Sequence, residues 1–223
     1  MTPVFIAGAH TDVGKTHVAC ALIEAARRRG LDVEALKPVV SGFDEANWAE
    51  SDPGRLLAAL GREATPQALE AISPWRFAAP LAPPLAARLE GCDLPLAPII
   101  EFCRLRLESS TMDLVIVEGV GGLMSPIAQA ATGLDLVAAL GAPVVLVGGS
   151  YLGAISHMLT ALETLRARAF PIVAAVISES APPAPDFGDT ASMLIEHATP
   201  VPVIAAPRGV ASDWPQRLLD GLG

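Results

Sequence analysis

The feature that most constrains the fold is a junction near the N-terminus, where an apolar segment runs through a glycine-bounded turn into a helical pattern. Residues 4–7 read Val-Phe-Ile-Ala, Gly8 and Gly14 bound the turn, and Lys15-Thr16 opens an amphipathic stretch. Glycines permit a sharp turn whose N–H groups point into one concavity, and the positive end of a following helix favours an anion there. The junction therefore predicts a P-loop, with Lys15 reaching the β- and γ-phosphates of ATP and the Thr16 hydroxyl ligating Mg²⁺.

This turn is one residue longer than in the common P-loop pattern, since five residues separate Gly8 from Gly14. A chance junction of strand, Gly-Lys-Thr and helix is the alternative, and the matching flanks on both sides argue against it. The extra residue indicates a particular subclass of P-loop protein.

Apolar runs of strand length alternate with helical patterns along the whole chain. Because these runs are continuous rather than alternating, we expect strands that are covered on both faces, as in a parallel sheet. The strands are expected at 4–7, 33–36, 114–117, 144–147, 172–177 and 203–205, and the helices at 16–29, 53–60, 98–107, 134–140, 153–168 and 189–197. This pattern predicts an α/β fold with a doubly wound, mostly parallel sheet and helices on both faces, like that of P-loop NTPases.

No polar linker divides the 223 residues, so we expect a single domain over residues 1–223. Two proline-rich stretches, 80–98 and 182–185, are expected to be long surface loops, either lids and binding segments or solvated connectors. The longest apolar region, 134–149, contains Asp135 and Pro143 and is too short to span a bilayer. No membrane partner is expected.

The charge and the cysteines limit the environment and the partners. A net charge of −9, from 15 basic and 24 acidic residues, argues against nucleic acid and favours small molecules. Cys20, Cys92 and Cys103 have neither metal-site spacing nor an even count for disulfides, which suits a reducing compartment. The N-terminus has no basic start before an apolar stretch and does not resemble a signal peptide. We therefore expect a cytoplasmic protein.

Only two basic residues are lysines, Lys15 and Lys37, and the other thirteen are arginines. A compositional preference for arginine explains those thirteen. Lysine offers a compact charge on a flexible stem, which phosphate chemistry uses where a planar guanidinium does not fit. Lys37 follows the expected strand 33–36, where a solvent-facing cap is the alternative, and we favour a functional role.

Two carboxylates are expected near the P-loop. Glu118 ends the apolar strand 114–117 and precedes a glycine-rich segment, and ligands of doubly wound sheets bind at the carboxyl ends of strands. It is either a Mg²⁺ carboxylate, direct or through water, or a solvated strand-end residue. Asp52 precedes Pro53 and a helical pattern, so it is either a helix N-cap or a further Mg²⁺ carboxylate. Two lysines and two carboxylates around a phosphate cradle indicate phosphoryl transfer.

These motifs resemble those of the dethiobiotin synthetases, the ATP-dependent enzymes that close the ureido ring in biotin biosynthesis. The family's loop reads approximately G-T-D-T-[DE]-V-G-K-T, and residues 8–16 read G-A-H-T-D-V-G-K-T with the same spacing. Further matches, in order along the chain, are 37–42, 51–52, 77–83, 117–122 and 152–157. The resemblance covers essentially the whole chain.

The resemblance implies a reaction in which an amine of 7,8-diaminononanoate adds to CO₂ to form a carbamate. The carbamate attacks the γ-phosphate of ATP, and the other amine closes the ring on the mixed anhydride, giving dethiobiotin, ADP and phosphate. As implied catalytic residues, Lys37 would neutralise the carbamate and the transferring phosphoryl group, and Lys15 would hold the β- and γ-phosphates. Thr16, Asp52 and Glu118 would surround the Mg²⁺ ion.

The resemblance also implies nucleotide and substrate contacts. The nucleotide positions are Asp12, Val13, Gly14, Lys15, Thr16, His17, Asp52, Glu118, Gly119, Val120, Gly121, Ser178, Glu179, Pro207, Arg208 and Gly209. Thr11 and Ser41 would contact the amine or carbamate end of the substrate, and the amides of Gly153, Ala154, Ile155 and Ser156 would receive its carboxylate. In the family this helix start comes from the neighbouring subunit, which implies a homodimer with shared sites. The free N–H groups of a helix start favour an anion in any case, and an ordinary capped helix start is the alternative.

Some positions depart from the family's pattern. Ala9-His10 replaces a Thr-Asp pair, and Ser178-Glu179 replaces an Asn-Asp pair that reads adenine, which leaves the nucleotide preference open. The side chains of His17, His157 and His197 lie on expected helices without metal-ligand spacing, and we expect them to pack or to lie on the surface.

Two rival functions share the expected fold. A regulatory switch ATPase of the partition or cell-division type usually carries an additional lysine early in the loop, where residues 9–11 read Ala-His-Thr and no third lysine exists. Another cofactor-synthesis ligase of the same fold would not be expected to match both 37–41 and 153–156.

Overall fold

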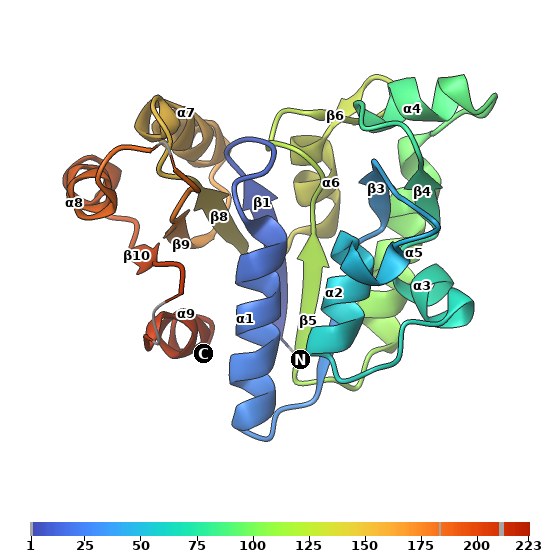
Figure 1. The fold of residues 1–223 in the computed structure, drawn as a ribbon, viewed down its shortest axis with the longest axis horizontal. Helices are drawn as coiled ribbons and strands as arrows, with labels where there is room; N and C mark the ends of the chain where they lie inside the picture. The colour runs from blue at the N-terminus through green and yellow to red at the C-terminus, as the bar shows by residue number, and fades with distance from the viewer. Residues whose placement is uncertain (1, 183, 210–211) are drawn as a thin grey trace.

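Six parallel strands form the central sheet of the computed structural model, which describes residues 2–182, 184–209 and 212–223. Their order across the sheet is β10-β9-β8-β1-β5-β2 (Figure 1). The strands are β1 (Thr2–Gly8), β2 (Val33–Leu36), β5 (Leu114–Glu118), β8 (Val144–Gly148), β9 (Ile172–Ser178) and β10 (Val203–Ala206). Every pair of neighbours is parallel, which confirms the predicted mostly parallel sheet.

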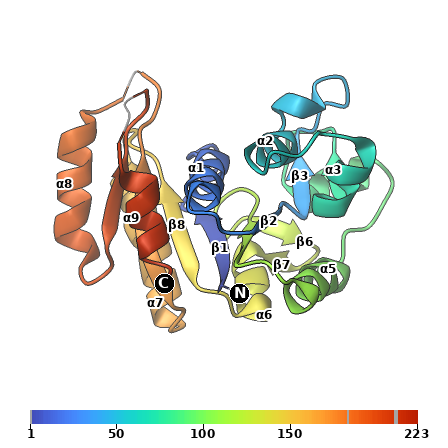
Figure 2. The same cartoon turned by 90° about the horizontal axis from the view of Figure 1, so that it is seen from below.

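Helices cover both faces of this sheet, as the doubly wound prediction requires. In Figure 2, α1 and α2 lie above the sheet while α5, α6 and α7 lie along its lower side. α9 packs beside α1, and α8 packs against α7 and β10 at one edge. These helices are α1 (Lys15–Arg28), α2 (Asp52–Ala59), α5 (Leu96–Ser109), α6 (Gly133–Leu140), α7 (Ala154–Ala167), α8 (Phe187–Ala198) and α9 (Trp214–Asp220).

The continuous apolar runs of the sequence are explained by burial on both faces. Every residue of β5 and of β8 is buried, and the interior of β1 is buried from Val4 to Gly8. A strand with helices on both sides has no solvent face, so polar alternation disappears. The one charged residue in these three strands is Glu118, at the last position of β5, where the strand reaches the site described below.

All six predicted strands and all six predicted helices are present, with ends that differ by at most two residues. The prediction of a long loop over 80–98 is wrong, because α4 (Pro83–Leu89) and the start of α5 lie within it. Proline is tolerated in the first turn of a helix, where its missing N–H would have no partner, so Pro83 and Pro84 begin α4. In the second proline-rich stretch, residues 182, 184 and 185 are in neither helix nor strand, and residue 183 lies outside the described residues.

Several short elements were not predicted from the sequence. They are the parallel pair β3 (Val39–Ser41) and β4 (Trp75–Phe77), the antiparallel pair β6 (Pro126–Ala128) and β7 (Ala131–Thr132), the 3₁₀ turn Trp48–Glu50, and the helices α3 (Pro66–Ile72), α4 and α9. None exceeds seven residues, which is too short for a clear periodic pattern. Among the described helices, none combines the length and the apolar character needed to span a bilayer.

The position of β1 determines where a ligand binds. β1 lies between β5 and β8, and the chain leaves it through α1 toward β2 at one edge, whereas α6 leads from β5 to β8 on the other side. In doubly wound sheets such a reversal opens a crevice at the carboxyl ends of the strands. The turn after β1 and the ends of β2 and β5 therefore face the same space.

Candidate active site

The turn between β1 and α1 follows a backbone path that requires glycine at both ends. Gly14 has a φ of 91°, and a Cβ atom there would lie 2.6 Å from Ser178 Oγ. A Cβ atom at Gly8 would lie 2.7 Å from the carbonyl oxygen of Gly121. The turn thus lies in close contact with the segment after β5 and with the last residue of β9. α1 begins at Lys15 with its free N–H groups at the turn.

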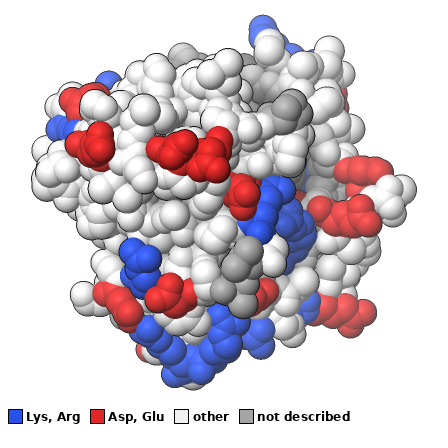
Figure 3. Space-filling model, turned by 60° about the vertical axis from the view of Figure 1, so that its left-hand side comes forward, with Lys and Arg blue, Asp and Glu red and all other residues white. Residues whose placement is uncertain are grey.

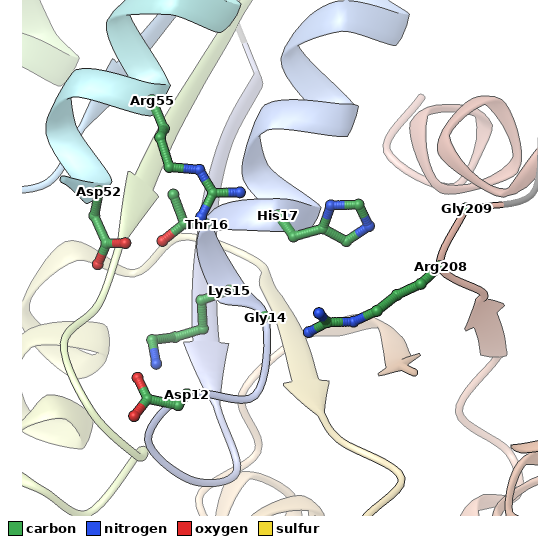
Figure 4. A pocket seen from close by; sticks show the side chains of 9 residues that line it. All are labelled: Asp12, Gly14, Lys15, Thr16, His17, Asp52, Arg55, Arg208 and Gly209. Carbon is green, nitrogen blue, oxygen red and sulfur yellow. The ribbon is translucent and has the colours of Figure 1, made fainter. Parts of the chain in front are cut away.

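A cavity of about 320 Å³ opens beside this turn, a size within the usual range of small-molecule sites (Figure 4). Its lining combines the turn and the start of α1 with the first turn of α2 and the segment that follows β10. The lining residues are Asp12, Gly14, Lys15, Thr16, His17, Asp52, Arg55, Arg208 and Gly209. Eight of these nine were expected at a nucleotide site from the sequence.

Lys37 lies just beyond β2 as a buried cation, with 1% of its surface exposed. Its Nζ donates to Glu118 Oε1 at 2.6 Å and to the Gly119 carbonyl oxygen at 2.9 Å, and it pairs with Asp52 Oδ2 at 3.2 Å. All three ammonium N–H donors thus have an acceptor. Burial acts to lower the pKa of Lys37, but the charges of Glu118 and Asp52 outweigh it and raise the pKa. The alternative of a solvent-facing cap is wrong.

The structure also excludes the alternative roles considered for the two carboxylates, a solvated strand-end residue for Glu118 and a helix N-cap for Asp52. Glu118 is 1% exposed, so it is not a solvated strand-end residue. The N-cap of α2 is Ser51, whose hydroxyl accepts from the Gly54 N–H at 3.3 Å, and Asp52 is the first helical residue. Asp52 was therefore wrong as an N-cap candidate, and its carboxylate faces Lys37 instead. Burial acts to raise the pKa of Asp52, but the positive charge of Lys37 and its hydrogen bond outweigh burial and lower the pKa.

The oxygen atoms around Thr16 fit a Mg²⁺ ion. The Thr16 hydroxyl donates to Glu118 Oε1 at 2.7 Å. Glu118 Oε2 is buried and has no hydrogen-bond partner in the part of the chain that the structure describes. A hydroxyl and two carboxylates are hard oxygen donors of the kind that Mg²⁺ prefers. Within the described residues, no cluster of three His, Cys, Asp or Glu side chains forms a complete metal cage. This is expected where substrate phosphates supply the remaining ligands.

Lys15 is buried with 7% of its surface exposed, at the start of α1. Burial, followed by the positive charge of Lys37, lowers the pKa of Lys15 from 10.5 to about 8. A bound phosphate would reverse this effect, because an adjacent anion favours the charged form of lysine.

This shift predicts that the affinity for ATP falls as the pH rises. The cation of Lys15 predominates below pH 8 and is lost above it, while the nucleotide complex requires the cation. Between pH 7 and pH 9 we expect the Kd for ATP to rise by up to about tenfold, with proton uptake on binding. Calorimetric titrations in two buffers of different ionisation enthalpy measure both quantities. The Lys15→Ala variant should bind weakly with no such pH dependence, and a flat profile in the unmodified chain would contradict the prediction.

A second cavity, of about 440 Å³, lies on the other side of the turn. It is lined by Ala9, His10, Thr11, residues 122–126, and the α7 residues His157, Thr160, Ala161 and Thr164. The His10 and His157 rings stack at 5.1 Å between centroids, and the Tyr151 hydroxyl lies 2.7 Å from His157 Nδ1. Thr11, an expected substrate contact, therefore faces a separate space from Lys15.

The structure does not bring every expected substrate residue into these cavities. Ser41 ends β3 and is half-buried, and it lines neither of the two cavities. Gly153 is the N-cap of α7 with a φ of 95°, and Ala154 to Ser156 form the first turn of that helix. None of these four residues lines the P-loop cavity within one chain, and only later residues of α7 line the second cavity.

The end of β9 and the segment after β10 are joined by hydrogen bonds between Glu179 and Arg208. Ser178, the last residue of β9, is buried beneath Gly14, with no partner for its Oγ among the described residues. The Arg208 N–H donates to Glu179 Oε2 at 2.7 Å, and Arg208 Nε donates to the Glu179 carbonyl oxygen. Glu179 thus holds the segment that carries Arg208 and Gly209 into the cavity, while Pro207 precedes the lining residues.

One lining residue was missed from the sequence. Arg55 lines the nucleotide cavity, and its spacing of three from Asp52 on a helix was the available signal. His17 was expected both at the nucleotide site and as a packing or surface side chain, and it lines the cavity while its ring packs against Trp214 at 5.7 Å between centroids. Among the described residues its buried Nε2 has no hydrogen-bond partner. Nothing in the sequence indicated that Trp214 would cover it.

The fold and this site define a P-loop nucleotide-binding protein, and the sequence profile of the AAA domain family matches residues 2–207. The chain is 53% identical over 223 residues to the ATP-dependent dethiobiotin synthetase BioD of Phenylobacterium zucineum, covering 100% of this chain and 95% of that protein. It is 53% identical over 214 residues to the protein of the same name from Caulobacter vibrioides, covering 96% and 95%. The chain therefore belongs to the dethiobiotin synthetase family of ATP-dependent enzymes.

Solved structures share the fold at low identity. The hydrogenase maturation factor HypB of Archaeoglobus fulgidus is 18% identical with a TM-score of 0.59, covering 100% of this chain and 91% of that one. The MinC:MinD cell division protein complex of Aquifex aeolicus matches with a TM-score of 0.54 at 10% identity, covering 99% and 86%. At these identities the likeness is one of fold, so the similarity to a cell division protein does not support the switch ATPase alternative.

Proposed function

We propose that this chain forms dethiobiotin from 7,8-diaminononanoate, CO₂ and ATP by the carbamate route. The observation that carries this proposal is the buried Lys37 cation, fixed by Glu118 and Asp52 at the end of β2 beside a P-loop lysine. A reaction through a carbamate and a phosphoryl group gathers negative charge at one point, and a fixed buried cation stabilises such charge strongly. The family membership supplies the substrate.

In the proposed reaction, the first amine of the substrate attacks CO₂ and loses a proton to give a carbamate. A carbamate oxygen then attacks the γ-phosphate and ADP leaves. The second amine attacks the carbonyl carbon of the mixed anhydride, expels phosphate and closes the ring. Lys15 holds the β- and γ-phosphates, and Lys37 neutralises the carbamate by exchanging one of its three present acceptors for a substrate oxygen.

Thr16, Asp52 and Glu118 are the residues that would hold Mg²⁺ in this proposal. The ion would supply charge neutralisation at the phosphates. Glu118 Oε2 supports this assignment, because it is buried with no partner among residues 2–182, 184–209 and 212–223, and a carboxylate oxygen without a donor or a cation is costly to bury. Lys37 holds the other oxygen of Glu118 and so fixes the direction in which Oε2 points.

We further propose that residues 1–223 act as one domain and that two copies form a dimer with shared sites. The separation of the α7 start from the P-loop cavity within one chain supports the second point, because Gly153 to Ser156 can then serve a neighbour's site. Thr11 and Ser41 remain the proposed contacts of the amine end. Nucleotide contacts remain proposed for the P-loop residues Asp12 to His17, for Gly119 to Gly121, and for the unit formed by Ser178, Glu179 and Pro207 to Gly209.

The proposed partners are small molecules. On the face shown in Figure 3, basic side chains gather in a recess and again along the lower edge, where acidic side chains lie beside them, and the rest of that face carries few basic side chains. The net charge of −9 agrees with this distribution. The absence of a nucleic-acid partner and a cytoplasmic location stay predictions from the sequence.

The direct test is a reaction with Mg-ATP, bicarbonate and 7,8-diaminononanoate. We expect phosphate release that depends on the diamine, with one phosphate formed per dethiobiotin detected by mass spectrometry. The Lys15→Ala variant serves as the inactive control. ATP hydrolysis that is indifferent to the diamine would overturn the proposal and favour a regulatory ATPase.

A further inference from the structure

Arg55 occupies the wall of the nucleotide cavity through its place on α2. α2 begins at Asp52, and residues three apart on a helix lie on the same face, so Arg55 follows Asp52 one turn later. Asp52 faces Lys37, and Arg55 lines the same cavity beyond it. Within the described residues, the Arg55 guanidinium makes no ion pair and no side-chain hydrogen bond, although acidic residues outnumber basic ones in this chain.

The neighbours of Arg55 show on which side of the nucleotide cavity its side chain lies. It also lines a groove of about 400 Å³ with His17, Cys20 and Glu24, all on α1 beyond the P-loop turn. In Figure 4, Arg55 from α2 and Arg208 from the far side both reach toward the start of α1. Burial and then the charges of Arg208 and Arg55 lower the pKa of His17, which agrees with their proximity. Arg55 therefore lies on the α1 side of the cavity.

The direction of a nucleotide in a P-loop follows from the chemistry of its parts. The P-loop lysine reaches the β- and γ-phosphates, and the backbone N–H groups of the turn and helix start cradle the α- and β-phosphates. The γ-phosphate therefore lies toward Lys15 and Lys37, while the α-phosphate lies toward His17. A guanidinium beside His17 is placed for the inner phosphates, and its planar fork suits two phosphate oxygens at once.

We propose that Arg55 binds the α- and β-phosphates of the nucleotide and holds ATP and ADP equally. The inference rests on the proposed ATP-dependent reaction, and it adds a nucleotide contact from outside the P-loop. Because ADP keeps both phosphates, the contact is the same before and after phosphoryl transfer. Arg55 therefore contributes to nucleotide affinity and not to the chemical step.

The test compares Arg55→Ala and Arg55→Lys with Arg62→Ala, which removes an exposed arginine from the segment just after α2. Calorimetric titration with ADP and with ATP, without the diamine, gives the Kd values. For Arg55→Ala we expect both Kd values to rise by about tenfold, the effect of one exposed charge-assisted contact. Arg55→Lys should recover part of the loss, Arg62→Ala should match the unmodified chain, and the thermal unfolding midpoints should stay the same.

Turnover separates this role from the alternatives. For Arg55→Ala we expect the KM for ATP to rise by about tenfold with kcat unchanged. A lower kcat with an unchanged Kd for ADP would mean that Arg55 acts on the γ-phosphate. Unchanged kcat, KM and Kd values would mean that Arg55 is a solvated side chain. Either result overturns the inference. Since the ADP titrations need no diamine, a failure to form dethiobiotin leaves them interpretable. If the chain forms dethiobiotin but Arg55→Ala has the same Kd for ADP as the unmodified chain, this inference is overturned and the proposed function stands.

Discussion

The Lys37→Arg variant is expected to lose at least about 99% of its turnover while it still binds ATP. The substitution keeps the positive charge and changes its shape. Lys37 Nζ has three N–H donors and three acceptors, namely Glu118 Oε1, the Gly119 carbonyl oxygen and Asp52 Oδ2, all within 3.2 Å. A guanidinium carries five donors in a plane, so at this buried position it leaves donors unpaired and moves the charge away from the reacting oxygens.

Three measurements decide this prediction: kcat with the diamine, the Kd for ATP, and the thermal unfolding midpoint. Arg28→Lys makes the reverse exchange at an exposed residue of α1 that pairs with Glu24 at 3.8 Å, and it should behave like the unmodified chain. A cooperative unfolding transition and retained ATP binding would show that Lys37→Arg is folded. Near-normal turnover in that folded variant would remove Lys37 from the chemistry.

The same buried cluster shows what the sequence could and could not predict. Lys37 and Glu118 each follow an apolar run of strand length, and parallel strands end at one edge, so their proximity was predictable. The sequence could not predict that Lys37 pairs with a single carboxylate oxygen of Glu118, because this depends on how far each side chain extends beyond its strand. Only the structure shows that Glu118 Oε2, which supports the Mg²⁺ assignment, is buried with no hydrogen-bond partner among the residues it describes.

The residues of α2 show a second limit. Ser51 and Asp52 are both good N-cap residues, and a one-residue difference in the helix start decides which of them caps. In the structure Ser51 is the N-cap of α2, and the Asp52 carboxylate pairs with Lys37. Arg55 then follows on the same face, but its place in the cavity depends on how α2 packs beside α1. Long-range packing of this kind leaves no signal in local sequence patterns.

The short helices and strands were not predicted from the sequence for a related reason. The β3–β4 pair and α3 contain three to seven residues each and depend on tertiary contacts, so neither a period of two nor one of 3.6 residues can be recognised in them. α4 was hidden by its prolines, which indicate a loop unless they fall at a helix start. The long helices α1, α5 and α7 have 14 residues each, and they were predicted within two residues.

The Gly14→Ala variant is expected to lose ATP binding by at least about a hundredfold, because it strains the P-loop in two ways. A left-handed backbone costs a residue with a Cβ roughly 1 to 2 kcal/mol. In addition, the new Cβ would lie 2.6 Å from Ser178 Oγ and 3.1 Å from Ser178 Cβ, so the turn or the end of β9 must move. The backbone N–H groups that bind phosphate belong to that turn, and a small displacement misaligns them.

Two further variants separate these causes. Gly91→Ala places a Cβ at a φ of 74° with no atom within 4 Å, so it measures backbone strain without overlap and should leave ATP binding unchanged. Ser178→Ala removes the hydroxyl, which has no partner among the described residues, at little cost by itself. The double variant Gly14→Ala/Ser178→Ala should therefore recover part of the stability lost in Gly14→Ala, as measured by the free energy of unfolding in denaturant. If it is no more stable than Gly14→Ala, overlap with the Ser178 hydroxyl is not the cause. If Gly14→Ala binds ATP normally, the turn does not hold the phosphates.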